Sequence, residues 1–265
     1  MLTACLLSES TFIQRREELE RNSQRLKKYM KIPDAQASLI ASRMNQSHVA
    51  REISLRLKDW TLATSSQTLW IMGNPFTPEC EASIAATHIV AIAQRANLPC
   101  LFFFCHLANF NGLRQDSERR HQDQLTTLLY ALIRQLSMLT PENFRDSYDF
   151  TSALDSLQGS PESIPKALDI IRALLLHTPR LLLCVIDGLQ ILGHRDTNSY
   201  IDQLLDALRA QNDSRVFKLL LTTRGSFPSG KKLDVMERLD CMTLPRKRPG
   251  RAVPGGQSLQ ELSFS

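Results

Sequence analysis

Four continuous apolar runs constrain the fold more than any other feature of this chain. They are "TLWIM" (68–72), "LPCLFFFC" (98–105), "RLLLCVID" (180–187) and "RVFKLLLTT" (215–223), with a weaker fifth, "LDCMTL" (239–244). A strand with one face in water alternates apolar and polar residues, and these runs do not alternate. Continuous apolar strands are typical of parallel sheets that helices cover on both faces.

The segments between these runs have helical periodicity. Apolar residues recur at spacings of three and four in residues 81–95, 121–139, 163–177 and 199–210. Because strands and helices alternate, we predict an α/β domain over residues 65–245. It would have three layers and a parallel sheet of about five strands.

The first 64 residues are predicted to form a helical region, either a helical hairpin or a linker. Phe12, Leu19 and Leu26 recur every seven residues within 12–30, which predicts one helix with a narrow apolar seam. A second predicted helix carries the apolar residues Val49, Ile53, Leu57 and Trp60.

The net charge of +5 is concentrated at the two ends of the chain. Residues 246–265 are rich in Arg, Pro and Gly, and we predict that this basic tail is disordered. Six cysteines show no C-x-x-C spacing, and no apolar run reaches the ~18 residues of a membrane span. We therefore expect an intracellular protein with reduced thiols, in the cytoplasm or, through its basic tail, in the nucleus.

A glycine after the first apolar run lies where a phosphate-binding loop would begin, in "TLWIMGNPFTPECEAS". With the pattern G-x-x-x-x-G-K-[ST] aligned on Gly73, Glu79 takes the lysine position and Cys80 the Ser/Thr position. Pro78 replaces the second glycine, and a longer loop would bring Ser83 to the Mg²⁺ position. The stretch fits either a degenerate phosphate site or an ordinary strand–turn–helix connection.

Two later runs end in residues suited to the same site. Asp187 ends an apolar run, where a carboxylate can hold Mg²⁺ through water, although an aspartate there also fits a helix cap. Arg224 ends another run and could meet a terminal phosphate, or lie on the surface. The carboxyl ends of parallel strands share one edge of a sheet, so these residues would lie near one another.

In their order along the chain, these segments resemble STAND-class P-loop NTPases, in particular the NACHT-like modules of fungal proteins. The resemblance covers roughly residues 12–245. It implies that Gly73, Asp187 and Arg224 are retained site residues. Glu79 and Gln190 depart from the pattern, because the family has a lysine and an acidic residue there.

The resemblance and the lost lysine together predict a pseudoenzyme, namely a non-hydrolysing scaffold for interaction or signalling. We expect no cofactor, with ATP and Mg²⁺ bound weakly at most. Vestigial contacts would come from Gly73, Ser83, Asp187 and Arg224, and Asp187 would hold the metal if Mg²⁺ binds. Protein partners are expected at the helical region.

Two other functions stay open from the sequence. One is an ATP- or GTP-binding switch with an atypical loop, in which Arg224 and the helix start near Glu81 hold the phosphates. The other is a nuclear or nucleic-acid-associated protein that acts through its basic ends.

Overall fold

A five-stranded parallel sheet forms the centre of the protein, as predicted from the continuous apolar runs. The structure is a computed structural model, and it describes residues 12–30, 49–75, 81–107, 117–210 and 215–243. The strands, in spatial order, are β3 (Cys100–Phe104), β5 (Leu181–Asp187), β6 (Val216–Arg224), β2 (Gln67–Gly73) and β7 (Arg238–Asp240). The strand that precedes the candidate phosphate loop, β2, therefore lies between the last two strands of the chain.

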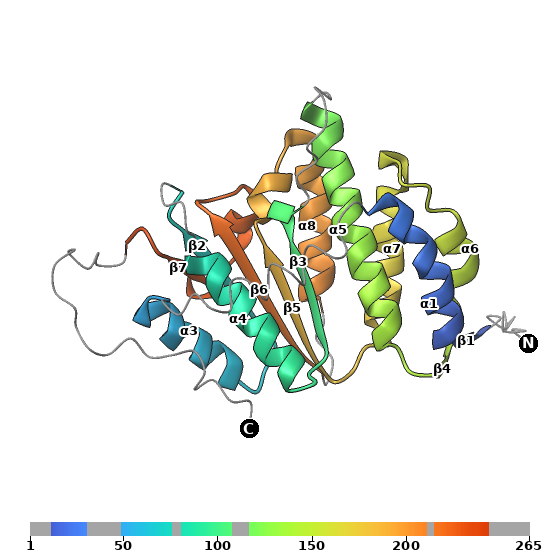
Figure 1. Ribbon diagram of the computed structural model, residues 1–265, viewed down its shortest axis with the longest axis horizontal. Helices are drawn as coiled ribbons and strands as arrows, with labels where there is room; N and C mark the ends of the chain where they lie inside the picture. Colours follow the sequence, from blue (N-terminus) through green and yellow to red (C-terminus); the bar gives the residue numbers. More distant parts are fainter. Residues whose placement is uncertain (1–11, 31–48, 76–80, 108–116, 211–214, 244–265) are drawn as a thin grey trace, which may run out of the picture.

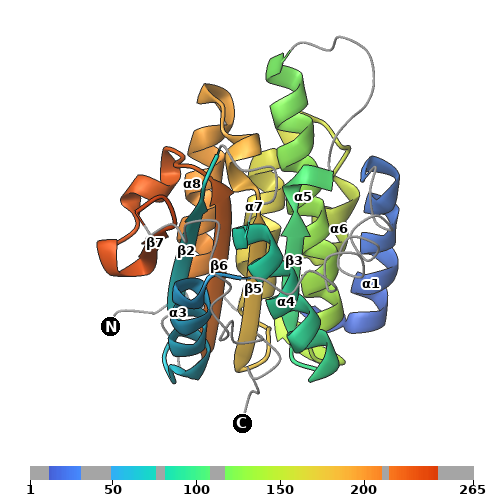
Figure 2. The same cartoon turned by 60° about the vertical axis from the view of Figure 1, so that its left-hand side comes forward.

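Helices cover both faces of this sheet (Figures 1 and 2), so the predicted three-layer α/β class is confirmed. One face carries α3 (Arg51–Leu62) and α4 (Glu81–Arg95), and the other carries α5 (Ser117–Leu139), α7 (Ile164–Leu175) and α8 (Arg195–Arg209). Further elements are α6 (Phe150–Asp155), η2 (Cys105–Leu107), η3 (Pro161–Ser163), η4 (Leu189–Leu192), η5 (Ser229–Lys232) and η6 (Val235–Glu237).

The two covered faces of the sheet explain why apolar and polar residues do not alternate along the strands. In β5, Val185 belongs to the apolar cluster beneath α3 and α4, whereas its neighbour Ile186 belongs to the cluster beneath α5, α7 and α8. In β6, Leu220 belongs to the cluster beneath α3 and α4, and Leu221 belongs to the cluster beneath α5, α7 and α8. Since each side chain of a central strand meets a buried layer, most positions select an apolar residue.

The helix predicted for residues 12–30 is wrong at its start. The first described residues form a strand, β1 (Phe12–Arg15), which pairs antiparallel with β4 (Asn143–Asp146) and is followed by α1 (Arg16–Gln24) and η1 (Arg25–Tyr29). In β1 the apolar Ile13 is 66% exposed and the polar Gln14 is 8% exposed, so the usual burial pattern is inverted. Leu19 and Leu26 are buried in the same cluster as α5.

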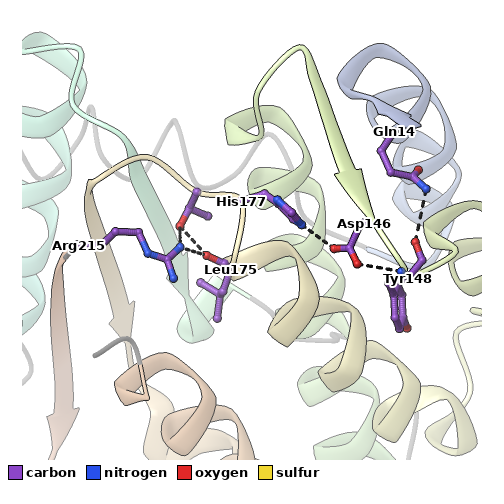
Figure 3. A network of polar contacts seen from close by, with 7 residues as sticks. Gln14, Asp146, Tyr148, Leu175, His177 and Arg215 are labelled. Atoms are coloured by element: carbon purple, nitrogen blue, oxygen red, sulfur yellow. Dashed lines mark hydrogen bonds and ion pairs between the residues drawn. The ribbon is translucent and has the colours of Figure 1, made fainter. Parts of the chain in front are cut away.

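Polar contacts hold the small sheet against α7 (Figure 3). The amide nitrogen of Gln14 donates to the carbonyl of Tyr148 at 3.4 Å, and the Tyr148 N–H donates to Asp146 Oδ1 at 2.8 Å. The other oxygen of Asp146 lies 2.5 Å from Nε2 of His177, which follows α7. Arg215, directly before β6, donates to the carbonyl of the last residue of α7. One end of α7 thus joins both sheets.

A side-chain amide covers the outer edge of β3, which has only β5 as a neighbouring strand. Oε1 of Gln135 in α5 accepts the N–H of Phe102 at 2.9 Å, and its Nε2 donates to the Phe102 carbonyl at 2.9 Å. The amide makes the two bonds that a further strand would make. It blocks pairing at this edge, where an open strand favours association.

The boundaries predicted at residues 64 and 245 stay predictions. Leu57 and Trp60 of α3 lie in one buried cluster with α4. The tail 246–265 lies outside the described residues.

Among the described helices, none combines the length and the apolar composition that crossing a membrane requires.

We predict that Lys218→Met stabilises the protein at pH 7. Lys218, on β6, is 3% exposed, and within the described chain its Nζ has no hydrogen-bond partner. Burial lowers the pKa of this amine from 10.5 to about 8. Removal of a buried, unsatisfied polar group should raise the free energy of unfolding by roughly 1–3 kcal/mol, measured by urea titration.

The gain should shrink at alkaline pH. Below pH 8 the amine is protonated in both states, so the cost of burying the charge is fully present. Between about pH 8 and 10.5 the folded state releases the proton and the unfolded state keeps it, so wild-type stability rises relative to the variant. Lys58→Met, at an exposed position, is the matched control. An equal effect at both positions would contradict the prediction.

We also predict that Gln135→Leu destabilises the protein and promotes self-association, because the Phe102 N–H and C=O lose their partners. The expected loss is roughly 1–3 kcal/mol, with light scattering reporting association. Gln135→Glu keeps an acceptor for the N–H but loses the donor, so it should fall between wild type and Leu. Wild-type behaviour of the Leu variant would show that the edge needs no cover.

Candidate functional site

Four residues lie on the same sheet face at the carboxyl ends of the strands. Side chains alternate along a strand, and Ile71, Val185 and Leu220 belong to the cluster beneath α4. The residues two positions on, or four for Arg224, are therefore also on the α4 face, and they are Gly73, Asp187, Thr222 and Arg224. Open α/β sheets bind their ligands outside this edge.

A buried carboxylate with two hydroxyl donors forms the centre of the site. Asp187, the last residue of β5, is 1% exposed. Its Oδ1 accepts hydrogen bonds from the Ser83 hydroxyl at 2.7 Å and the Thr222 hydroxyl at 2.5 Å. Ser83 lies in the first turn of α4 and Thr222 lies opposite Asp187 on β6. The cluster joins two central strands to the helix that follows β2.

Gly188 lets the chain turn away directly after Asp187. Its φ of +81° is in the left-handed region, and its N–H donates to the Thr222 carbonyl at 2.8 Å. A β-carbon there would come within 2.9 Å of the His106 ring and 3.4 Å of Cys105. Both the backbone conformation and the close packing of η2 therefore require glycine.

Cys105 contributes a neutral group to this site. The thiol is fully buried, and burial together with the charge of Asp187 raises the pKa of Cys105 well above its ordinary value. A thiol that stays protonated is a poor nucleophile. It serves here as an apolar neighbour of the carboxylate.

Gly73 and Arg224 end adjacent strands as ladder partners. The Gly73 carbonyl accepts the N–H of Gly225 at 2.8 Å, and the Met72 carbonyl accepts the N–H of Cys241 at 2.9 Å. The end of β2 is thereby fixed between β6 and the chain after β7. Arg224 is partly exposed beside it.

The first turn of α4 carries a carboxylate that bridges two helices. Oε2 of Glu81 accepts the N–H of Ala50 at 3.0 Å, and Ala50 precedes α3 as its N-cap. Glu81 thus places negative charge at the start of both helices, where helix dipoles favour it. A phosphate approaching the start of α4 would meet this charge.

The predicted site residues are partly brought together. Ser83 contacts Asp187 directly, and Gly73 lies beside Arg224 in the ladder, whereas Glu79 and Cys80 lie outside the described residues. The oxygen donors around Asp187 are of the type that a divalent cation prefers. A group of three or more His, Cys, Asp or Glu ligands is not found in the described part of the chain.

Thr222 and Cys105 were not among the predicted site residues. Thr222 lies inside the fourth predicted strand, and the register that sets it against Asp187 depends on how β5 and β6 align. An equal count forward from the starts of the two predicted runs, at Arg180 and Arg215, would have suggested the pair.

We predict that Thr222→Val destabilises the fold because the shape is kept and one hydroxyl donor to Asp187 is lost. The expected loss in the free energy of unfolding is about 1–3 kcal/mol, measured by urea titration. Thr222→Ser retains the donor and is the control. Together with Ser83→Ala the losses should be non-additive, since both hydroxyls serve one oxygen. Equal stability of the Val and Ser variants would contradict this role.

Comparison with known proteins places the chain in a family. A family model described as nephrocystin 3, N-terminal, matches residues 54–224, from α3 to the last residue of β6. The match includes Gly73, Ser83, Asp187 and Arg224. A search of curated proteins finds no match. Since the matched residues make up more than half of the 265 in the chain, the protein belongs to the nephrocystin 3 N-terminal family.

Proposed function

We propose that this protein is a NACHT/STAND-like module that does not hydrolyse nucleotide and acts as an interaction or signalling scaffold. We further propose that it is related to multidomain proteins of fungi. The carrying observation is the engagement of Asp187 Oδ1 by both Ser83 and Thr222 in a buried cluster.

Charge supports weak nucleotide binding at most. A triphosphate needs cationic or N–H donors, and charge-assisted contacts are its strongest ones. Glu81 instead adds a carboxylate at the start of α4, where it accepts the Ala50 N–H. The sequence adds Glu79 at the position of the loop lysine. Arg224 offers one positive charge, on the same sheet face as Asp187. The carboxylates of Glu79, Glu81 and Asp187 outweigh it.

The segment after Asp187 supports the absence of hydrolysis. A hydrolase of this class needs an acid near the metal-binding carboxylate to orient the attacking water. Here η4 follows with the sequence Leu189–Leu192, in which no residue is acidic. Leu189 and Leu192 are both fully buried and anchor this turn to the core, while Gln190 and Ile191 between them are partly exposed and carry no acid.

Mg²⁺ is the ion that the oxygen donors of Asp187 and Ser83 would hold if nucleotide bound. Its role there would be to neutralise phosphate charge. The hydroxyl–carboxylate cluster contributes to stability without it, because each hydrogen bond already satisfies a buried group.

Restoring the loop pattern tests the proposal. We predict that wild type shows no saturable Mg-ATP binding in calorimetry up to about 1 mM, equivalent to a binding free energy weaker than about −4 kcal/mol. The triple variant Pro78→Gly, Glu79→Lys and Cys80→Ser supplies the missing donors and should bind at least about tenfold more tightly. Adding Asp187→Asn to the triple variant should remove the Mg²⁺ dependence.

Two results would overturn the proposal. Micromolar Mg-ATP or Mg-GTP affinity of wild type, lost on Glu79→Lys, would establish the atypical switch instead. Phosphate release above a heat-treated control by wild type, abolished by Asp187→Asn, would establish an enzyme. Circular dichroism of each variant confirms that the fold is retained.

A further inference from the structure

We infer that β7 is the interface of a symmetric dimer, in which the β7 strands of two copies of this chain pair antiparallel and join their central sheets. The occupant of this sheet edge is a second copy. The inference goes beyond the proposed function and does not rest on it, because the residues around Asp187 take no part.

The outer edge of β7 offers its backbone for pairing. Among the described strands, only β2 lies beside β7, which borders the central sheet (Figure 2). Met72 is the ladder partner of Asp240, and its carbonyl accepts the N–H of Cys241 at 2.9 Å. Since successive residues face opposite neighbours, Cys241 and Leu239 face β2, whereas Arg238 and Asp240 direct their backbone groups outward.

The outward groups of Asp240 can take up a further strand. Its N–H has no hydrogen-bond partner in the described part of the chain. Its carbonyl accepts from Thr243, at 2.8 Å from the hydroxyl and 3.3 Å from the N–H. Strand pairing would replace the longer of these two bonds.

The sequence of β7, Arg-Leu-Asp, is complementary to itself when it runs antiparallel. A two-fold axis at Leu239 sets Arg238 opposite Asp240 of the second copy, and Asp240 opposite its Arg238. These are the residues with outward backbone groups, so they form the hydrogen-bonded pairs of the new ladder. Opposite charges directly across a ladder are favourable and like charges are unfavourable. One surface patch thus serves both copies, as a two-fold interface requires.

The two charged side chains lie on the same face of the sheet. Arg238 donates to the Leu233 carbonyl and lies 5.8 Å over the Trp70 ring. Asp240, two positions on, is on the same face, and its Oδ1 accepts the N–H of Met242 at 2.8 Å. Leu239 lies on the opposite face, against the cluster beneath α3 and α4, where it would meet Leu239 of the second copy.

The other carboxylates beside this edge are engaged within their own copy. Glu237 pairs with Arg209 at 3.0 Å, and Asp234 accepts the N–H of Met236 at 3.1 Å as the cap of η6. The match across the axis therefore depends on the order of charges along β7 and not on the net charge of the region.

Exposed apolar side chains flank β7 at both ends. Val235 and Met236, in η6 before the strand, are 75% and 72% exposed, and Met242, after the strand, is 48% exposed. Antiparallel pairing sets the start of β7 in one copy beside its end in the other, so Val235 and Met236 would lie near Met242 of the second copy. These contacts add the apolar area that a short strand alone lacks.

Sedimentation equilibrium of the full chain tests the dimer. We expect a reversible monomer–dimer equilibrium between about 1 and 300 µM, the range in which a small interface associates. Asp240→Arg sets arginines opposite each other, and Arg238→Asp does the same with aspartates. Each variant should weaken association at least about tenfold.

A mixture of these two variants gives the sharpest result. In a mixed pair, one chain carries only arginine and the other only aspartate at positions 238 and 240, so the charges across the axis are complementary again. The equimolar mixture should associate at least about tenfold more tightly than either variant alone. Circular dichroism confirms that each variant is folded.

Hydrogen exchange tests the same edge in the wild-type chain. The Asp240 amide should exchange at least about tenfold more slowly in concentrated than in dilute protein. The Cys241 amide, already bonded to Met72, should exchange equally in both. As a matched pair, Met236→Asp should weaken association, whereas Leu176→Asp, 65% exposed after α7, should leave it unchanged.

Four outcomes would overturn the inference. They are a monomer over the whole concentration range, a dimer that neither single variant weakens, a mixture that associates no better than its components, and Asp240 exchange that is independent of concentration. Mg-ATP titration is a separate measurement, so failure here leaves the proposed function standing.

Discussion

The parallel pairing of β5 with β6 is the constraint on which the rest of the structure depends. It places two apolar strands where each face meets a helical layer, so both strands are buried except at their end residues. The same register sets Asp187 opposite Thr222 at the last rung, and the hydroxyl then satisfies a carboxylate that burial would otherwise make costly. The positions of α4, through Ser83, and of η2, through Gly188, follow from that rung.

Much of the fold could be predicted from the sequence, because strands that are buried on both faces appear in it as continuous apolar runs. Continuous apolar runs identified the four long strands, and periodicity identified α4 within its true bounds. The small sheet could not be predicted this way. In β1 the exposed Ile13 and the buried Gln14 reverse the expected pattern, and the heptad spacing from Phe12 to Leu26 imitates a helix. Its stability comes from pairing with β4 across more than a hundred residues, which local patterns do not encode.

The candidate site was predictable residue by residue but not as an assembly. Asp187 and Ser83 were each suggested by position, while their hydrogen bond depends on how α4 packs over β5. The contact between Glu81 and Ala50 joins the starts of two helices 31 residues apart, and composition gives no hint of it. The effect of Glu79 on charge could be predicted from the motif alone. A glutamate in the lysine position changes the local charge, and no tertiary contact is needed to infer this.

The amide of Gln135 has a consequence for how this protein can assemble. It occupies both backbone groups of Phe102, so a further strand cannot pair at the middle of the β3 edge. A central sheet that is capped at one of its two edges cannot grow by strand pairing in both directions, so open-ended filaments do not arise through this sheet.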